Sequence, residues 1–190
     1  MTATEPSSHL PGGGASYDAC TRFARVSRLE VGDRVPEMVL EDQHRRSVDL
    51  RRLTEDRAVL VVFYPFAFSG ICSGELTGLR DRLGELETDD CTLLTVSCDP
   101  VYTLRAAADR DGLFFPLLSD FWPHGEVARR FGVFDESRGC ADRSSFLVGR
   151  DGLVRWAVHN PVGKARDLDA HAAAVRELDG TGEPRPRVLD

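Results

Sequence analysis

The sequence predicts an α/β fold in which a central mixed sheet is flanked by helices. Short apolar runs that are typical of buried strands alternate with segments whose apolar residues recur every three or four positions, as on one face of a helix. Late in the chain, two strand-like runs flank a Gly-Arg-Asp-Gly turn, which indicates an antiparallel hairpin. Parallel strands joined by helical crossovers and followed by such a hairpin form a mixed sheet.

The first part of the predicted domain carries the clearest strand and helix patterns. A short strand is expected near residues 38–40. Residues 58–64 (AVLVVFY) form a continuous β-branched and aromatic run, which is typical of a strand buried on both faces. The segment 72–86 then has leucines three and four positions apart, and this spacing predicts a helix directly after the buried strand.

The rest of the chain continues the alternation. Strands are predicted at 92–97, 115–118, 145–148 and 153–158, and helices at 102–110, 125–131 and 168–178. This order fits a thioredoxin-like arrangement best. A flavodoxin-like winding agrees less well, because the chain contains a hairpin and has no phosphate-binding loop after its first strand.

Length and composition limit the class of protein. A chain of 190 residues, with 42% hydrophobic and 29% charged residues, fits one globular domain with tails. We expect a flexible extension at 1–24, the domain at 25–178 and a Pro/Gly-rich tail at 179–190. The net charge of −7 argues against a nucleic-acid partner, and no apolar run approaches the ~18 residues of a membrane span. The start lacks a secretory signal, so we expect a cytoplasmic protein with reduced thiols.

The cysteines and histidines do not suggest a metal site. The five histidines are scattered and the cysteines contain no C-x-x-C pair, so we expect no metal and no cofactor. Five cysteines is an odd number, which leaves at least one outside any intramolecular disulfide. One of these thiols is therefore a candidate reactive group.

The segment YPFAFSGICSGELTGLR contains that candidate. The buried strand ends at Tyr64, Pro65 stops the ladder, and Cys72 falls in the first turn of the next helix. Unpaired backbone N–H groups and the positive end of the helix dipole favour the thiolate there, and the thiolate is the nucleophile. Ser69 places a hydroxyl near the sulfur, and Glu75 is one turn further on. From its position alone, an inert buried thiol explains Cys72 equally well.

The surrounding pattern favours the reactive thiol. Pro65, Ser69 and Cys72 form P-x-x-x-S-x-x-C, which resembles the active-site signature of the peroxiredoxins, with serine where threonine is common. Glu75 and Arg143, the latter at the start of a late strand, match two further family positions. The segments FYPFAFSGIC and FWPHG resemble the AhpE-like, one-cysteine subgroup, and the resemblance covers about residues 29–178.

The resemblance implies a thiol peroxidase that reduces hydrogen peroxide or organic hydroperoxides and forms a homodimer. Cys72 would attack the peroxide and become a sulfenic acid. Arg143 would stabilise the thiolate and the leaving oxygen, and Ser69 would orient the peroxide. Pro65 would limit water, while Glu75 and Tyr64 would support the site. A peroxide-sensing redox regulator, or a peroxiredoxin scaffold recruited to specialised sulfur or biosynthetic chemistry, is an alternative.

The thiol that reduces the sulfenic acid stays open. No cysteine follows Cys140, so a resolving cysteine in a C-terminal arm is excluded from this sequence. Cys98 and Cys140 are the foremost internal candidates, Cys91 is expected at the far edge of the sheet, and Cys20 lies in the extension. For each of them, a bystander thiol without a role in the reaction is the favoured explanation.

An external reductant is the alternative to an internal thiol. Lysine, isoleucine and asparagine each occur once, which indicates a GC-rich genome, since their codons are rich in A and T. With the resemblance, this makes mycothiol with mycoredoxin, or a thioredoxin-like protein, a candidate partner.

Overall fold

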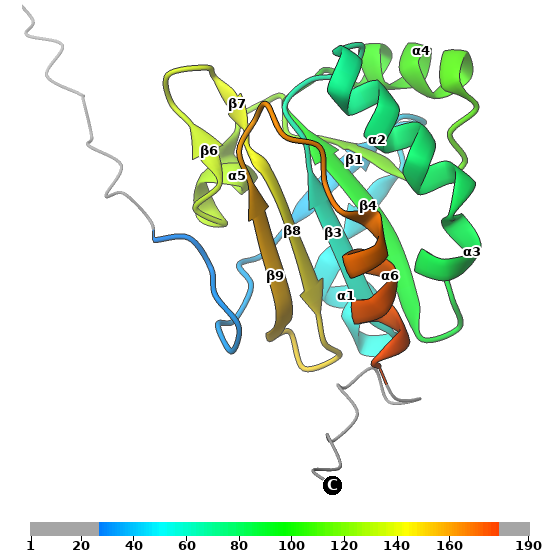
Figure 1. Ribbon diagram of the computed structural model, residues 1–190. Helices are drawn as coiled ribbons and strands as arrows, with labels where there is room; N and C mark the ends of the chain where they lie inside the picture. The colour runs from blue at the N-terminus through cyan, green and yellow to red at the C-terminus, as the bar shows by residue number, and fades with distance from the viewer. Residues whose placement is uncertain (1–26, 179–190) are drawn as a thin grey trace, which may run out of the picture.

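The computed structural model describes residues 27–178, so the expected extension and tail lie outside the described residues. A seven-stranded mixed sheet forms the centre of this part of the chain, with strand order β2-β1-β5-β4-β3-β8-β9 (Figure 1). Its strands are β1 (Val39–Asp42), β2 (Ser47–Asp49), β3 (Ala58–Phe63), β4 (Cys91–Ser97), β5 (Leu117–Ser119), β8 (Arg143–Val148) and β9 (Val154–Asn160). The short strands β6 (Phe134–Asp135) and β7 (Cys140–Ala141) form a separate ribbon.

The pairing of the strands confirms the predicted mixed sheet. β3, β4 and β5 are parallel, whereas β8 runs antiparallel to both β3 and β9. All six residues of β3 are buried, as expected of a β-branched strand covered on both faces. Because β3 and β4 are parallel and β8 is antiparallel, the ends of β3 and β4 and the start of β8 meet at one edge of the sheet.

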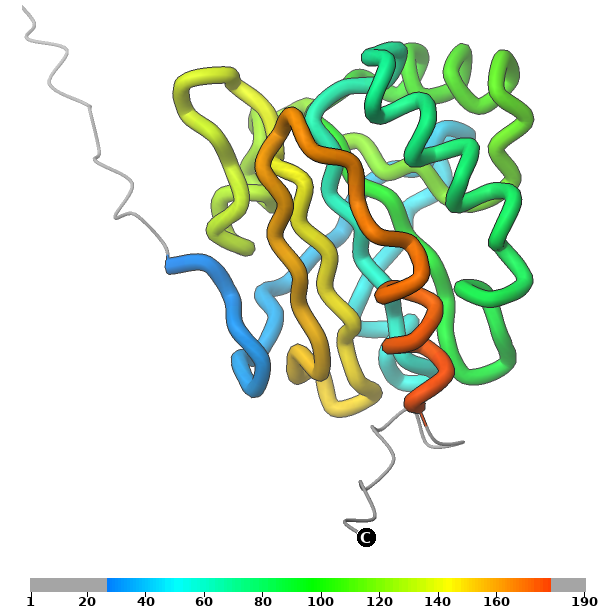
Figure 2. The backbone as a smooth tube through the Cα atoms, viewed as in Figure 1, coloured from blue at the N-terminus to red at the C-terminus, as the bar shows by residue number. Residues whose placement is uncertain are grey.

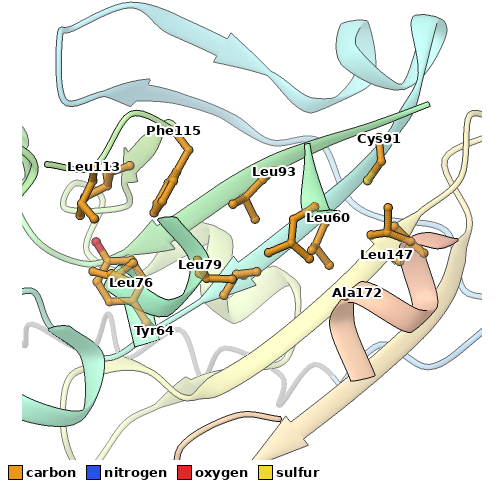
Figure 3. Close-up of a cluster of buried hydrophobic side chains, with 14 of the residues drawn as sticks. Leu60, Tyr64, Leu76, Leu79, Cys91, Leu93, Leu113, Phe115, Leu147 and Ala172 are labelled. Atoms are coloured by element: carbon orange, nitrogen blue, oxygen red, sulfur yellow. The ribbon is translucent and has the colours of Figure 1, made fainter. Parts of the chain in front are cut away.

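Helices cover both faces of the sheet. They are α1 (Leu50–Asp56), α2 (Gly70–Asp81), α3 (Leu83–Leu86), α4 (Val101–Asp111), α5 (Glu126–Arg130) and α6 (Leu168–Arg176). One hydrophobic cluster joins the sheet to α2, α3, α4 and α6, and a second joins it to α1 and α5. Figure 3 shows part of the first cluster, where Leu60, Leu93 and Leu147 of three strands lie on the same side as Ala172 of α6.

The observed helices and strands differ from the predicted ones in two respects: one predicted helix is divided, and several short elements were not predicted. The predicted helix at 72–86 is two helices, broken at Arg82, whose side chain pairs with both Glu85 and Asp169 and so ties the break to α6. The sequence patterns missed α1, β2 and the β6–β7 ribbon, each of them seven residues or shorter. Elements this short contain too few residues for an apolar period to be recognised.

Two loops approach the same edge of the sheet. The loop after β3 leads into α2, and residues 161–167 run back from β9 to α6 at the end where α2 begins (Figure 2). Phe68 in the first loop has a left-handed backbone, with φ of 64°, just before α2 starts. This edge is therefore where the backbone brings Cys72, Arg143 and the loop 161–167 together.

Candidate active site

Cys72 lies in the first turn of α2 and is completely buried. The Nη2 atom of Arg143 donates a hydrogen bond to its sulfur at 3.3 Å. A guanidinium carries its charge at any physiological pH, so it stabilises negative charge on a neighbouring sulfur. The sulfur thus sits between a helix N-terminus and a permanent cation, with little water around it.

Arg143 begins β8 and is 2% exposed. Each of its three nitrogens has a partner. Nε donates to the carbonyl of Val162 at 2.6 Å, Nη1 donates to Glu75, and Nη2 faces the sulfur of Cys72. These three partners fix the planar guanidinium group in one orientation, in which Nη2 is the nitrogen that faces the sulfur.

Glu75 joins two buried arginines. It lies one turn after Cys72 in α2 and pairs with Arg143 and with Arg166, which sits in the loop before α6. Arg166 also donates to the carbonyl of Phe63 at the end of β3. Burial lowers the pKa of Arg166 to about 10, although the charge of Glu75 acts in the opposite direction. Two guanidiniums around one carboxylate give this buried cluster an excess of positive charge.

Sequence reasoning missed Arg166. It lies 94 positions after Cys72 in a loop without periodicity, and no spacing relates it to the P-x-x-x-S-x-x-C motif. Arg166 contacts Glu75 and Phe63 because the loop 161–167 returns over the start of α2.

Ser69, Pro65 and Tyr64 lie in the loop that leads to Cys72. Ser69 is the N-cap residue of α2 by backbone conformation and is half-buried, but its side chain makes no capping hydrogen bond. The hydroxyl therefore stays available to a ligand. Pro65 and Tyr64 are buried beside it. Burial raises the pKa of Tyr64, so its phenol stays protonated.

Asp99 ties this loop to the neighbouring strand. Its Oδ2 accepts hydrogen bonds from the backbone N–H of Ala67 and from the hydroxyl of Ser97, both at 2.8 Å. Burial raises the pKa of this carboxyl, whereas the two hydrogen bonds lower it. Sequence reasoning missed Asp99 as well, although its position two residues after the end of β4 could have indicated an edge of the sheet.

The other described cysteines are buried and free. Cys91 pairs with Ala58 at the start of β3 and β4, so it lies at the opposite end of the sheet from Cys72. Cys98 follows β4, and Cys140 begins β7, three residues before Arg143. Cys20 lies outside the described residues.

Within 27–178, there is no group of three or more His, Cys, Asp or Glu residues arranged to hold a metal ion. In the same range, no helix is both long and apolar enough to cross a membrane.

The chain is similar to known proteins over most of its length. Residues 31–157 match the model of the AhpC/TSA family. Alkyl hydroperoxide reductase E of Mycobacterium tuberculosis is 47% identical over 150 residues, which cover 79% of this chain and 98% of that protein.

Solved structures resemble the fold. The crystal structure of peroxidoxin BcpB from Mycobacterium tuberculosis matches with a TM-score of 0.72 and 28% identity, over 80% of this chain and all of that one. The crystal structure of Enterococcus faecalis AhpC matches with a TM-score of 0.70 and 27% identity, over 78% of this chain and 91% of that one.

Proposed function

This chain belongs to the AhpC/TSA family of peroxiredoxins and is a thiol-dependent peroxidase, and we propose that Cys72 is the sulfur that reacts with the peroxide. Its similarity to alkyl hydroperoxide reductase E supports a one-cysteine type of reaction with peroxide. The observation that carries the proposal is the 3.3 Å hydrogen bond from Arg143 to the sulfur of Cys72.

The chemistry follows from that contact. The Cys72 thiolate attacks one peroxide oxygen, the O–O bond breaks, and the other oxygen leaves as an alkoxide or hydroxide that takes up a proton. Cys72 is left as a sulfenic acid. Negative charge moves from the sulfur to the leaving oxygen, and the fixed guanidinium of Arg143 lies where it stabilises both.

The loop residues have supporting roles in this proposal. Ser69 offers a hydroxyl that no capping bond engages, and it orients the peroxide together with the backbone N–H of Cys72. Pro65 and Tyr64 are buried and limit water at the sulfur. Glu75 positions Arg143 and is in turn held by Arg166.

The electrons that return Cys72 to the thiol come from an external thiol. We propose that the substrates are hydrogen peroxide or organic hydroperoxides. After each reaction, mycothiol with mycoredoxin, or a thioredoxin-like protein, supplies these electrons to Cys72 in the cytoplasm. The proposal rests on the similarity to the mycobacterial reductase and on the single occurrence of lysine, isoleucine and asparagine in the sequence.

We further propose a homodimer through the aromatic surface beside the active-site loop. The exposed side chains there are Phe66, Phe68, Ile71, Phe121 and Trp122, and Trp122 is 82% exposed. Phe66, Phe68 and Ile71 lie just after β3 and Phe121 and Trp122 just after β5, two parallel strands that end at the same edge. Burying such side chains between two copies removes apolar area from water.

The test compares Cys72→Ser with Cys91→Ser, a matched change at the far end of the sheet. Peroxide consumption is followed with dithiothreitol in excess. We expect Cys72→Ser to lose the activity and Cys91→Ser to keep it. Wild-type consumption of peroxide by Cys72→Ser would overturn the assignment.

A further inference from the structure

The loop between β3 and α2 adopts a conformation that its own backbone does not favour. Phe68 has φ of 64°, which is unfavourable for a residue with a side chain, so contacts with other segments have to maintain it. At the ends of the loop, the backbone N–H of Tyr64 donates to the carbonyl of Val96 and that of Ser73 donates to the carbonyl of Ser69. Residues 65–68 between these ends need partners of another kind.

Asp99 supplies the first of these partners. The backbone N–H of Ala67 donates to its Oδ2 at 2.8 Å, and within 27–178 this is the one hydrogen bond that residues 65–68 make. Asp99 is itself fixed, because the hydroxyl of Ser97 donates to the same oxygen at 2.8 Å and the hydroxyl of Ser119 donates to its carbonyl at 2.7 Å. These two serines end β4 and β5, so Asp99 fastens the loop to two neighbouring strands.

Arg110 supplies the second partner. The central carbon of its guanidinium lies 4.5 Å from the centre of the Phe68 ring, which is within the range of a cation–π contact. The Nη2 atom of the same side chain donates to the hydroxyl of Ser73 at 3.0 Å. Phe68 precedes Cys72 and Ser73 follows it, so one arginine contacts the chain on both sides of the reacting sulfur.

Both partners belong to the segment around α4. Asp99 comes two residues before this helix, and Arg110 lies in its last turn. The helix lies next to α2, where Arg80 donates to the carbonyl of Asp111 at 2.6 Å (Figure 1). The loop that leads to Cys72 is therefore held from α4.

We propose that Asp99 and Arg110 are positioning residues for the reduction of peroxide, because they hold the loop that places the hydroxyl of Ser69. This inference rests on the proposed roles of Cys72 and Ser69. The side chain of Ser69 makes no capping hydrogen bond, so the backbone of the loop determines where its hydroxyl lies. Asp99 and Arg110 do not touch the peroxide and act on the reaction through this position alone.

The first test changes Asp99 in the full chain and follows oxidation of Cys72 by hydrogen peroxide in stopped flow. We expect Asp99→Ala to react roughly 10- to 100-fold more slowly, since a displacement of about 1 Å in a group that orients the substrate can cost this much. Asp99→Asn should recover most of the rate, because its amide oxygen still accepts the N–H of Ala67. Asp109→Ala, an exposed change in the same helix, is the matched control and should keep the wild-type rate.

The second test changes Arg110, whose side chain is partly exposed and whose loss does not endanger folding. Arg110→Leu should slow the oxidation of Cys72 by a smaller factor than Asp99→Ala, because it leaves the hydrogen bond to Ala67 intact. Arg105→Leu, which removes an exposed arginine of the same helix, is its matched control. Circular dichroism checks that every variant is folded. A wild-type rate in both Arg110→Leu and Asp99→Ala would overturn the inference.

A change of background distinguishes positioning of Ser69 from general damage to the structure. Ser69→Ala should be slow by itself, and adding Asp99→Ala should slow it no further, because the hydroxyl to be placed is already absent. An equal loss of rate from Asp99→Ala in both backgrounds would overturn the inference and leave Cys72 as the reacting sulfur. A wild-type rate in Ser69→Ala would do the same. An unoxidised Cys72 in the wild-type protein would overturn the proposed function and this inference together.

Discussion

Arg166 binds both carboxylate oxygens of Glu75. Its backbone N–H donates to Oε1 at 2.8 Å, and its guanidinium donates to Oε2 at 2.8 Å. Oε2 also accepts from Arg143, so one carboxylate holds the residue that faces Cys72. The geometry of the site therefore depends on a buried cluster with two cations and one anion, and changes at Arg143 and Glu75 have testable effects.

Arg143→Lys should reduce the rate of Cys72 oxidation while the protein stays folded. A lysine has one charged nitrogen and cannot reach Val162, Glu75 and Cys72 at once, as the guanidinium does. Loss of one fixed group that stabilises a transition state costs roughly 100- to 1,000-fold in rate. Stopped-flow oxidation by hydrogen peroxide measures this, with the exposed Arg176→Lys as the control. An unchanged rate would contradict the role given to Arg143.

Glu75→Gln should destabilise the fold as well as slow the reaction. The change leaves two buried guanidiniums facing a neutral amide, and breaking a buried ion pair in this way costs about 3–5 kcal/mol. Urea unfolding at neutral pH measures the loss of stability. Glu85→Gln, which removes an exposed carboxylate paired with Arg82 and Arg176, should change it little. Equal effects of the two changes would contradict the structural role of the Glu75 cluster.

Local patterns explain why much of the fold was predictable. β3 and α2 carry continuous or periodic apolar residues, and such patterns depend only on near neighbours in sequence. The same holds for Pro65, Ser69, Cys72 and Glu75, which lie within 11 consecutive residues. Their order in the chain is enough to place them around one helix start.

Some features of the site and fold could not be predicted because they depend on contacts between segments that are distant in the sequence. Arg166 meets Glu75 only because the loop 161–167 returns over α2, and Asp99 meets Ala67 only because β4 lies beside β3. The break between α2 and α3 likewise depends on the pairing of Arg82 with Asp169 of α6. No spacing within a single segment contains these relationships.

Gly132→Ala should destabilise the protein through its contact with the start of the described chain. Gly132 has φ of 69°, and an added Cβ would lie 2.5 Å from the backbone Cα of Arg28. A left-handed backbone at a residue with a side chain costs about 1–3 kcal/mol, and the clash with backbone adds to this. Gly74→Ala in α2 has nothing within 4 Å of its Cβ and should stabilise by roughly 0.5–1 kcal/mol. Urea unfolding of both variants checks the prediction, which fails if Gly132→Ala matches Gly74→Ala.

His171 should make stability fall as the pH is lowered through the acid range. The imidazole is buried, with Nδ1 at 2.8 Å from the carbonyl of Asp167 and Nε2 at 2.9 Å from the hydroxyl of Ser145. Burial lowers its pKa to about 4 from an ordinary value of 6.5. Between these two values the unfolded chain binds a proton that the folded chain does not, so stability decreases with falling pH. A shift of this size corresponds to about 3 kcal/mol when complete.

The change that isolates this effect is His171→Gln, which removes the titration but keeps hydrogen-bonding groups. Asp120 acts in the opposite direction, because burial raises its pKa to about 6 and its protonation favours the folded state. The informative quantity is therefore the difference in unfolding free energy between wild type and variant at each pH, which cancels Asp120. This difference should shrink steadily from about pH 6.5 to pH 4, because only the wild type loses stability through His171. A constant difference over this range would mean that His171 takes up its proton equally well in the folded and unfolded chain.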